Sequence, residues 1–160
     1  ACAATKQTIW VIGGWHYGDS LTDGYHLADI LRYNPYDDQW TKCGTIPCGV
    51  TENGVAYAFI TKKIMKKFKA SVEDASNLVN CMDSIKGSLI WILFVEYDNE
   101  IRVRIRSRYI PVVGIGEQFN GGGHANACGA TLPNKKQIKD LLSVADNNLK
   151  VFKEEHKELF

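Results

Sequence analysis

Two stretches in the second half of the chain carry residues that could bind an anion. The first, "IRVRIRSR" at 101–108, holds four arginines at every second position: Arg102, Arg104, Arg106 and Arg108. The second, "GGGHAN" at 121–126, places three glycines directly before His124, with Asn126 two residues later. A guanidinium group matches the geometry of a phosphate, and a glycine backbone lets a ligand approach closely. Together the two stretches predict a phosphate-binding site.

The four arginines have two possible kinds of counter-charge. Period-two alternation places them on one face of a strand, with the apolar residues on the other face. Acidic residues of the same hairpin could neutralise them: Glu96, Asp98 and Glu100. That interpretation fits Arg102 and Arg104, which lie nearest the predicted turn. For Arg106 and Arg108, farther from the turn, we favour a bound anion.

The glycine segment also has two interpretations. Gly121, Gly122 and Gly123 can adopt positive φ and expose their N–H groups to a ligand. His124 can donate to a phosphate oxygen, and the Asn126 amide can contact a base edge or a sugar hydroxyl. The alternative is a flexible turn with an exposed histidine that binds nothing. The segment is not a P-loop, because no Gly-Lys-Ser or Gly-Lys-Thr follows and a helix is predicted before the glycines.

Composition excludes some classes of protein. The 160 residues include 19 basic and 18 acidic side chains, so net charge alone indicates neither a nucleic-acid nor a membrane partner. The longest apolar run, "LIWILFV", is too short to cross a bilayer. Five cysteines form an odd set, which favours free thiols and a cytoplasmic location. A metal shared by Cys43 and Cys48 is the less favoured alternative.

Hydrophobic periodicity predicts an α+β (α/β-like) fold with helices on a small mixed sheet. The front of the chain is predicted to hold a strand at 8–12, a short helix around 27–31 and a linker at 43–49. Strands are expected at 55–60, 88–97, 100–108 and 127–132, and helices from Ser71, at 111–119 and at 134–152. The lysine-rich run at 61–69 is interpreted as a solvated helix face, with an RNA-steering surface as the alternative.

The arginine row, the short helix and "FNGGGHANACGATL" together resemble one known family. They are similar to the C-terminal, DHH-associated domain of the Asp-His-His phosphoesterases, in the branch of oligoribonucleases (nanoRNases) and pAp phosphatases. The segments "GVAYAFIT" and "ASNLVNCMDSIKG" extend the resemblance over residues 50–150. It implies a nucleotide-binding domain at 49–160, preceded at 1–48 by the truncated or degenerate tail of a catalytic lobe and a linker.

The resemblance also implies the residues of a substrate site. They are Arg106, Gly121, Gly122, Gly123, His124 and Asn126, with a looser fit for Arg108 and Asn80. Two positions depart from the family pattern, which has glycine where Asn120 stands and alanine where Cys128 stands. Asparagine tolerates left-handed backbone and cysteine is small and apolar, so the site is expected to survive both changes.

The catalytic metal site of the family is not visible in this chain. Val11 and Ile12 stand where the resemblance would place a metal-binding Asp-Thr pair, and the chain has neither an Asp-His-His triplet nor an Asp-x-Asp pair. The expected partners are therefore a nucleotide or short oligoribonucleotide and a catalytic lobe outside this chain, which would hold manganese. No metal is expected here, and the chain alone is expected to be inactive. A homodimer, a stand-alone binding module and a structural domain stay open.

Overall fold

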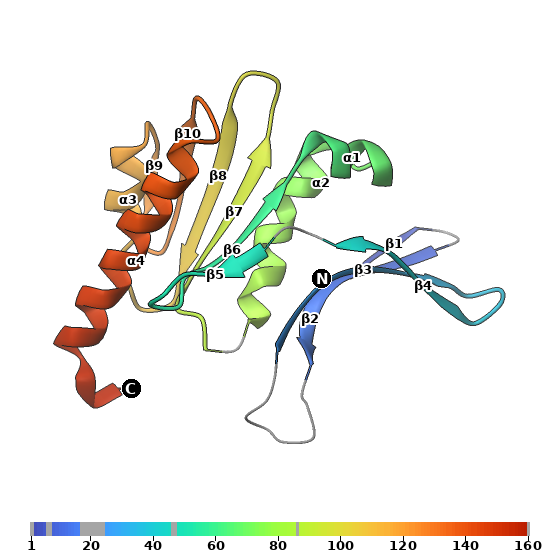
Figure 1. The fold of residues 1–160 in the computed structure, drawn as a ribbon, viewed down its shortest axis with the longest axis horizontal. Coiled ribbons are helices and arrows are strands. Elements are labelled where there is room, and N and C mark those ends of the chain that lie inside the picture. Colours follow the sequence, from blue (N-terminus) through green and yellow to red (C-terminus); the bar gives the residue numbers. More distant parts are fainter. Residues whose placement is uncertain (1, 6–7, 17–24, 46–47, 86, 160) are drawn as a thin grey trace.

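The structure, a computed structural model, describes residues 2–5, 8–16, 25–45, 48–85 and 87–159. These residues form two sheets, a four-stranded sheet within residues 2–45 and a six-stranded sheet within residues 48–132 (Figure 1). Helices pack on the six-stranded sheet, which contains both parallel and antiparallel strand pairs. The predicted α+β class is confirmed.

The front sheet is an antiparallel meander in the order of the sequence. Its strands are β1 (Cys2–Thr5), β2 (Thr8–His16), β3 (Tyr25–Asn34) and β4 (Gln39–Thr45). The helix expected around 27–31 is wrong, because that segment is the middle of β3. Leu27, Ile30 and Leu31 have helical spacing, but Ile30 pairs with Ile12 on one side and Gly44 on the other. Pairing along both edges of the strand overrides a short local pattern.

The six-stranded sheet begins three residues after the front sheet ends, inside the predicted linker. Its order is β5 (Cys48–Val50), β6 (Ala56–Ile60), β7 (Ile90–Glu96), β8 (Ile101–Ser107), β10 (Ala127–Leu132) and β9 (Gly122–His124). Only β6 and β7 run parallel among these neighbours. The β7–β8 hairpin predicted around Asp98 and Asn99 is present.

Three short helices connect the parallel strands β6 and β7. They are α1 (Lys62–Phe68), α2 (Val72–Asn77) and the 3-10 helix η1 (Leu78–Ser84). The predicted capping box opens α2, since Ser71 Oγ accepts from Asp74 N and the Asp74 carboxylate accepts from Ser71 N. In α1 the lysines are exposed and Met65 is buried, as expected of a solvated helix face.

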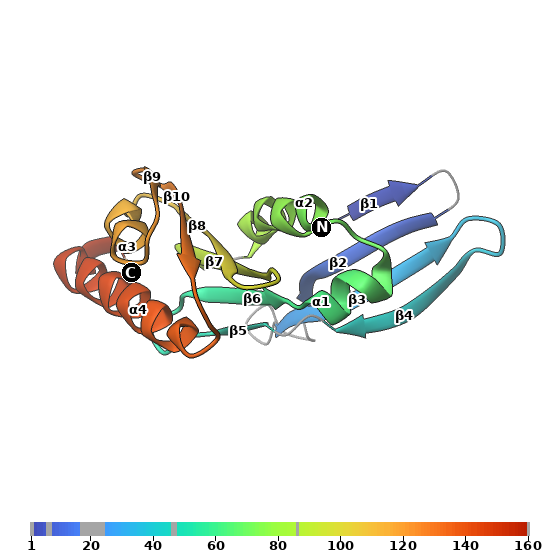
Figure 2. The ribbon, with the colours of Figure 1, turned by 90° about the horizontal axis from the view of Figure 1, so that it is seen from above.

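The two faces of the six-stranded sheet are covered differently (Figure 2). Helices α3 (Val113–Gln118) and α4 (Gln137–Glu155) pack on one face, against a core that includes Phe94, Val103 and Ile105. On the other face, α1, α2 and η1 pack over β6 and β7, around residues such as Leu93 and Val95. No residue of β8, β9 or β10 belongs to this second core, and Arg102 and Arg104 on this face of β8 are exposed.

Helix α4 is joined to the turn between β5 and β6 by one carboxylate. Asp146 accepts hydrogen bonds from Thr51 Oγ1, from Asn53 N at 2.9 Å and from Asn53 Nδ2 at 2.8 Å. Lys153 Nζ donates to the Asn53 carbonyl at 2.8 Å. Burial raises the pKa of Asp146, but the hydrogen bonds and the Lys153 charge outweigh it, and the pKa lies below its ordinary value.

Candidate functional site

The arginine row and the histidine that follows the glycines share one face of the sheet. Arg106 on β8 pairs with Ala127 on β10, and Ala127 pairs with His124 on β9. Residues paired directly across a sheet point to the same side. Two strand spacings separate the backbones of Arg106 and His124 by about 10 Å, with only a methyl side chain between them. Pairing through β10 therefore brings together two residues that are 18 positions apart in sequence.

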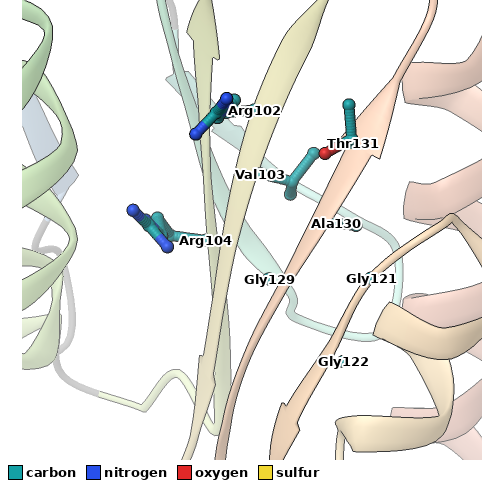
Figure 3. A pocket seen from close by; sticks show the side chains of 8 residues that line it. All are labelled: Arg102, Val103, Arg104, Gly121, Gly122, Gly129, Ala130 and Thr131. Carbon is teal, nitrogen blue, oxygen red and sulfur yellow. The ribbon is translucent and has the colours of Figure 1, made fainter.

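The next row of the same face has almost no side chains. Arg104 pairs with Gly129, and Gly129 pairs with Gly122. A Cβ atom at Gly129 would lie 3.7 Å from Arg104 Nη1, so the guanidinium extends beside this glycine. A hollow of about 190 Å³ opens here (Figure 3), lined by Arg102, Val103, Arg104, Gly121, Gly122, Gly129, Ala130 and Thr131. Figure 3 shows Arg102 and Arg104 projecting from β8 to the side opposite Val103.

The arginines at the two ends of the row have protein partners. Arg102 Nε lies 2.8 Å from Glu100 Oε1, so the predicted neutralisation by the hairpin is correct for Arg102. Arg108 Nη2 lies 2.8 Å from Asp83 Oδ1, and the same nitrogen donates to the Asp83 carbonyl. Arg108, which we favoured as an anion ligand, thus joins the end of β8 to η1. Its binding role stays a prediction.

Arg104 and Arg106, in the middle of the row, differ from the end arginines in their ion-pair partners. Among the described residues, neither Arg104 nor Arg106 has a carboxylate within ion-pair distance. The expected pairing of Arg104 with hairpin carboxylates is therefore wrong, because Glu100 bonds to Arg102 and Glu96 to Lys135. Distance from the turn did not predict this division, because Arg108 finds its carboxylate outside the hairpin, at Asp83 on η1.

Arg106 is held firmly although it lacks a counter-ion in the described part of the chain. Its Nη1 donates to the carbonyls of Ile105 at 2.9 Å and Cys128 at 3.4 Å. Burial lowers the pKa of Arg106, and the charge of Arg104 lowers it further. A guanidinium keeps its proton even so. The half-buried cation therefore lies in an environment that an anion would improve.

The three glycines have different structural roles, and the predicted loop is the edge strand β9. A Cβ at Gly121 would overlap the Gly129 carbonyl oxygen, and one at Gly123 would lie 2.7 Å from the Ala127 oxygen. Gly123 also has φ +148°, which side chains disfavour. In contrast, a Cβ at Gly122 would have no atom within 4 Å, and Gly122 is not among the residues of positive φ. Gly121 and Gly123 are needed for packing, whereas Gly122 leaves open space on the site face.

The two departures from the family pattern fit the structure. Asn120 has φ 54°, in the left-handed region that glycine and asparagine favour. Cys128 is buried beneath α3, where its Sγ donates to the Val112 carbonyl at 3.1 Å. Both substitutions keep the backbone geometry that leads into and out of β9.

Asn126 also has a structural role that the sequence did not reveal. Its Nδ2 donates to Ser107 Oγ and to the Ile110 carbonyl, both at 3.1 Å. These bonds join the β9–β10 turn to the end of β8 and to the segment that follows it. Direct contact of Asn126 with a ligand stays a prediction. Asn80, the looser fit, is exposed on η1.

The described residues do not fit a manganese site. In the part of the chain that the structure covers, no three His, Cys, Asp or Glu side chains gather closely enough to hold a metal ion. Val11 and Ile12 lie within β2, where the structure describes the backbone but not the side chains. No described helix is long and apolar enough to span a membrane.

Comparison with known protein families agrees with this geometry. A model described as the DHHA1 domain matches residues 52–151, well over half of the chain. The chain therefore belongs to the DHHA1 domain family, the DHH-associated family that the arginine and glycine motifs resemble. Residues 1–47 match a second model, described as the Kelch motif.

Curated relatives match this chain over part of their own length. The chain is 42% identical over 83 residues to the bifunctional oligoribonuclease and PAP phosphatase NrnA of Bacillus subtilis, covering 52% of this chain and 26% of that protein. It is 37% identical over 133 residues to the uncharacterized protein MG371 of Mycoplasma genitalium, covering 82% of this chain and 39% of that protein. The chain thus spans well under half of either relative.

A solved structure shows the same fold. An exopolyphosphatase-related protein from Bacteroides fragilis superposes with a TM-score of 0.57 at 27% identity, over 64% of this chain and 33% of that one.

Two different matches cover part of the front segment, residues 1–48. Four antiparallel strands are the number in one propeller blade, which agrees with the Kelch motif match. The MG371 match spans 133 aligned residues, whereas only 109 residues lie between Glu52 and the end of the chain. The match therefore also extends into the front segment. Assignment of residues 1–48 to the tail of a catalytic lobe stays a prediction.

Proposed function

We propose that residues 49–160 form the nucleotide-binding part of a phosphoesterase that hydrolyses short oligoribonucleotides, pAp or cyclic or linear dinucleotides. The observation that carries this proposal is the shared face of Arg106 and His124, separated by Ala127 and without a counter-charge for Arg106 among the described residues. The names of the relatives, oligoribonuclease and PAP phosphatase, support the same class of ligand.

Each group at the site has a defined task in this proposal. Arg106 neutralises a phosphate oxygen, and its carbonyl contacts hold the guanidinium in one orientation before the ligand binds. His124 donates to the same phosphate from the edge strand. Gly122 and Ala127 leave room for the ligand against the sheet. Orientation of the phosphate lowers the entropic cost of reaction at a catalytic lobe, where manganese would supply the hydrolytic chemistry.

The first test is Arg106→Ala, with nucleotide binding measured by calorimetry. We expect a loss of about 1.5–3 kcal/mol in the free energy of binding 5′-AMP or pAp, because a charge-assisted contact is removed. Arg102→Ala is the matched control on the same strand, and it should change binding little because Glu100 already pairs with Arg102. Equal losses from both variants would contradict a defined site and indicate a diffuse positive surface.

A stand-alone nucleotide-binding module is the second candidate. The observation that favours it is that the family match and the face that holds Arg106 and His124 both lie within residues 52–151. The full-length protein distinguishes the two candidates. Binding of a dinucleotide without hydrolysis in the presence of manganese would favour the module, whereas hydrolysis would favour the phosphoesterase.

A further inference from the structure

Tyr109 is an exposed aromatic residue in an unfavourable backbone conformation. It directly follows Arg108, in the segment between β8 and α3, and its side chain is 82% exposed. Its φ is 66°, in the left-handed region that a bulky side chain disfavours. The ring therefore packs little against the domain, and its burial does not offset the backbone strain. Strain of this kind persists only where the surrounding structure imposes it, and it is frequent at ligand sites.

Hydrogen bonds on both sides of Tyr109 impose this conformation. The Ser107 hydroxyl donates to the Ile110 carbonyl, which closes a turn around Tyr109. Asn126 Nδ2 donates to both oxygens of this bond, each at 3.1 Å. The backbone that carries the Tyr109 ring is therefore fixed by the protein before a ligand binds.

The residues on either side of Tyr109 are also bonded to the β9–β10 turn. The Ala125 carbonyl accepts from Val112 N at 2.7 Å, and the Asn126 carbonyl accepts from the backbone N of the last residue of β8 at 3.1 Å. His124, the last residue of β9, directly precedes these two turn residues. Tyr109 thus lies at the same end of the sheet as the proposed phosphate site.

We propose that Tyr109 stacks on the base of a nucleotide whose phosphate lies at Arg106 and His124. The inference rests on the proposed function, because that phosphate positions the ligand. Every base has a π-face, so a stack on an exposed aromatic ring adds affinity without selecting a particular base. Tyr109 would thereby distinguish nucleotides from sugar phosphates, which contacts to the phosphate alone cannot do.

The test compares calorimetric binding of 5′-AMP and ribose 5-phosphate, which carry the same phosphate monoester and differ in the base. Tyr109→Gly should weaken 5′-AMP binding about fivefold or more, as expected for loss of one base–aromatic stack, and change ribose 5-phosphate binding less than about twofold. Tyr109→Phe keeps the ring and should bind both ligands within about twofold of wild type.

Thermal unfolding gives a second readout, which separates a ligand contact from a structural role. Glycine accepts positive φ without strain, so the thermal midpoint of Tyr109→Gly should equal or exceed that of wild type while its 5′-AMP affinity falls. Lys69→Gly is the matched control, because Lys69 has φ 51° at the end of α1. This control should also keep or raise the midpoint, and it should leave both affinities unchanged.

The contrary outcomes have different meanings. Unchanged 5′-AMP affinity in Tyr109→Gly would overturn the stacking role and leave the proposed function intact. Equal weakening of both ligands would also overturn it, because Tyr109 would then act on the phosphate rather than on the base. If Arg106→Ala leaves the binding of both ligands unaffected, the proposed function itself is wrong.

Discussion

The polar groups around Asp146 and those around Arg106 are attached to the same core but differ in their partners. At Asp146 the carboxylate receives hydrogen bonds from Thr51 and Asn53, and Lys153 binds the Asn53 carbonyl. At Arg106 the described chain supplies backbone carbonyls but no carboxylate. The first region stabilises the fold, and the second has charge that is available to a ligand.

This contrast gives a practical way to separate the two roles. Substitutions in a region whose polar groups are paired should lower stability and leave ligand binding intact. Substitutions in an unpaired region should lower binding and leave stability intact, because the fold gains little from an uncompensated charge. The glycine run 121–123 contains both kinds of position.

The largest effect is expected from the pair Gly121→Val and Gly122→Val. Gly121→Val should cost about 3 kcal/mol or more of folding stability, since its Cβ would overlap the Gly129 carbonyl on the neighbouring strand. Gly122→Val should change stability by less than about 1 kcal/mol, because its Cβ meets nothing within 4 Å. The new side chain should instead occupy the ligand space and weaken nucleotide binding at least tenfold.

Chemical denaturation and calorimetry on both variants make this comparison. If Gly122→Val unfolds the domain as readily as Gly121→Val, the middle glycine also serves packing. The interpretation that Gly122 leaves open space for a ligand would then be wrong.

An intermediate effect is expected at Asp146. Asp146→Ala should lower the free energy of unfolding by about 1–3 kcal/mol, because it leaves the partly buried donors of Thr51 and Asn53 without an acceptor. Nucleotide affinity should be unchanged, measured at a temperature where the variant is folded. A change in affinity equal to that of Arg106→Ala would contradict the separation of the two regions.

The same carboxylate gives a pH dependence with a defined sign. Because the pKa of Asp146 is lowered in the folded state, its contribution is present above the unfolded pKa of about 3.9 and is lost as pH falls through the folded value. Wild type should therefore lose more stability than Asp146→Asn between about pH 5 and pH 2 in urea titrations. Parallel loss in both proteins would place the acid sensitivity elsewhere.

The smallest effect is expected at His124, which is exposed on the edge strand. His124→Asn should weaken binding of a phosphodiester dinucleotide about three- to tenfold in calorimetry, because the imidazole N–H donor is replaced by a shorter amide donor. Equal affinities of both proteins would place His124 away from the phosphate.

Local sequence signals were sufficient for most of the six-stranded sheet. The capping box at Ser71, the β7–β8 hairpin and the β10 strand at 127–132 are all present where their residue patterns predict them. These elements depend on contacts between near neighbours, which the sequence contains directly. The last helix is also present, although it spans Gln137–Glu155 rather than 134–152. Helix ends depend on local bonds that periodicity does not resolve.

Two local predictions failed because distant segments decided the outcome. The segment around Ile30 has helical spacing but forms β3, since β2 and β4 pair with it on both edges. The glycines read as a loop, but pairing with β10 makes 122–124 an edge strand. In both cases the hydrogen bonds come from strands that a window of neighbouring residues does not include.

The sequence by itself determined the kinds of group at the site and the family to which the domain belongs. The period-two arginines, the glycines and His124 are readable without coordinates, as is their resemblance to the DHH-associated domain. Only the tertiary structure decided which arginines are available: Glu100 and Asp83 engage Arg102 and Arg108, and leave Arg104 and Arg106 on the open face. The physical reason is that residue type sets which charges exist, whereas sheet pairing and helix packing set which charges find a partner.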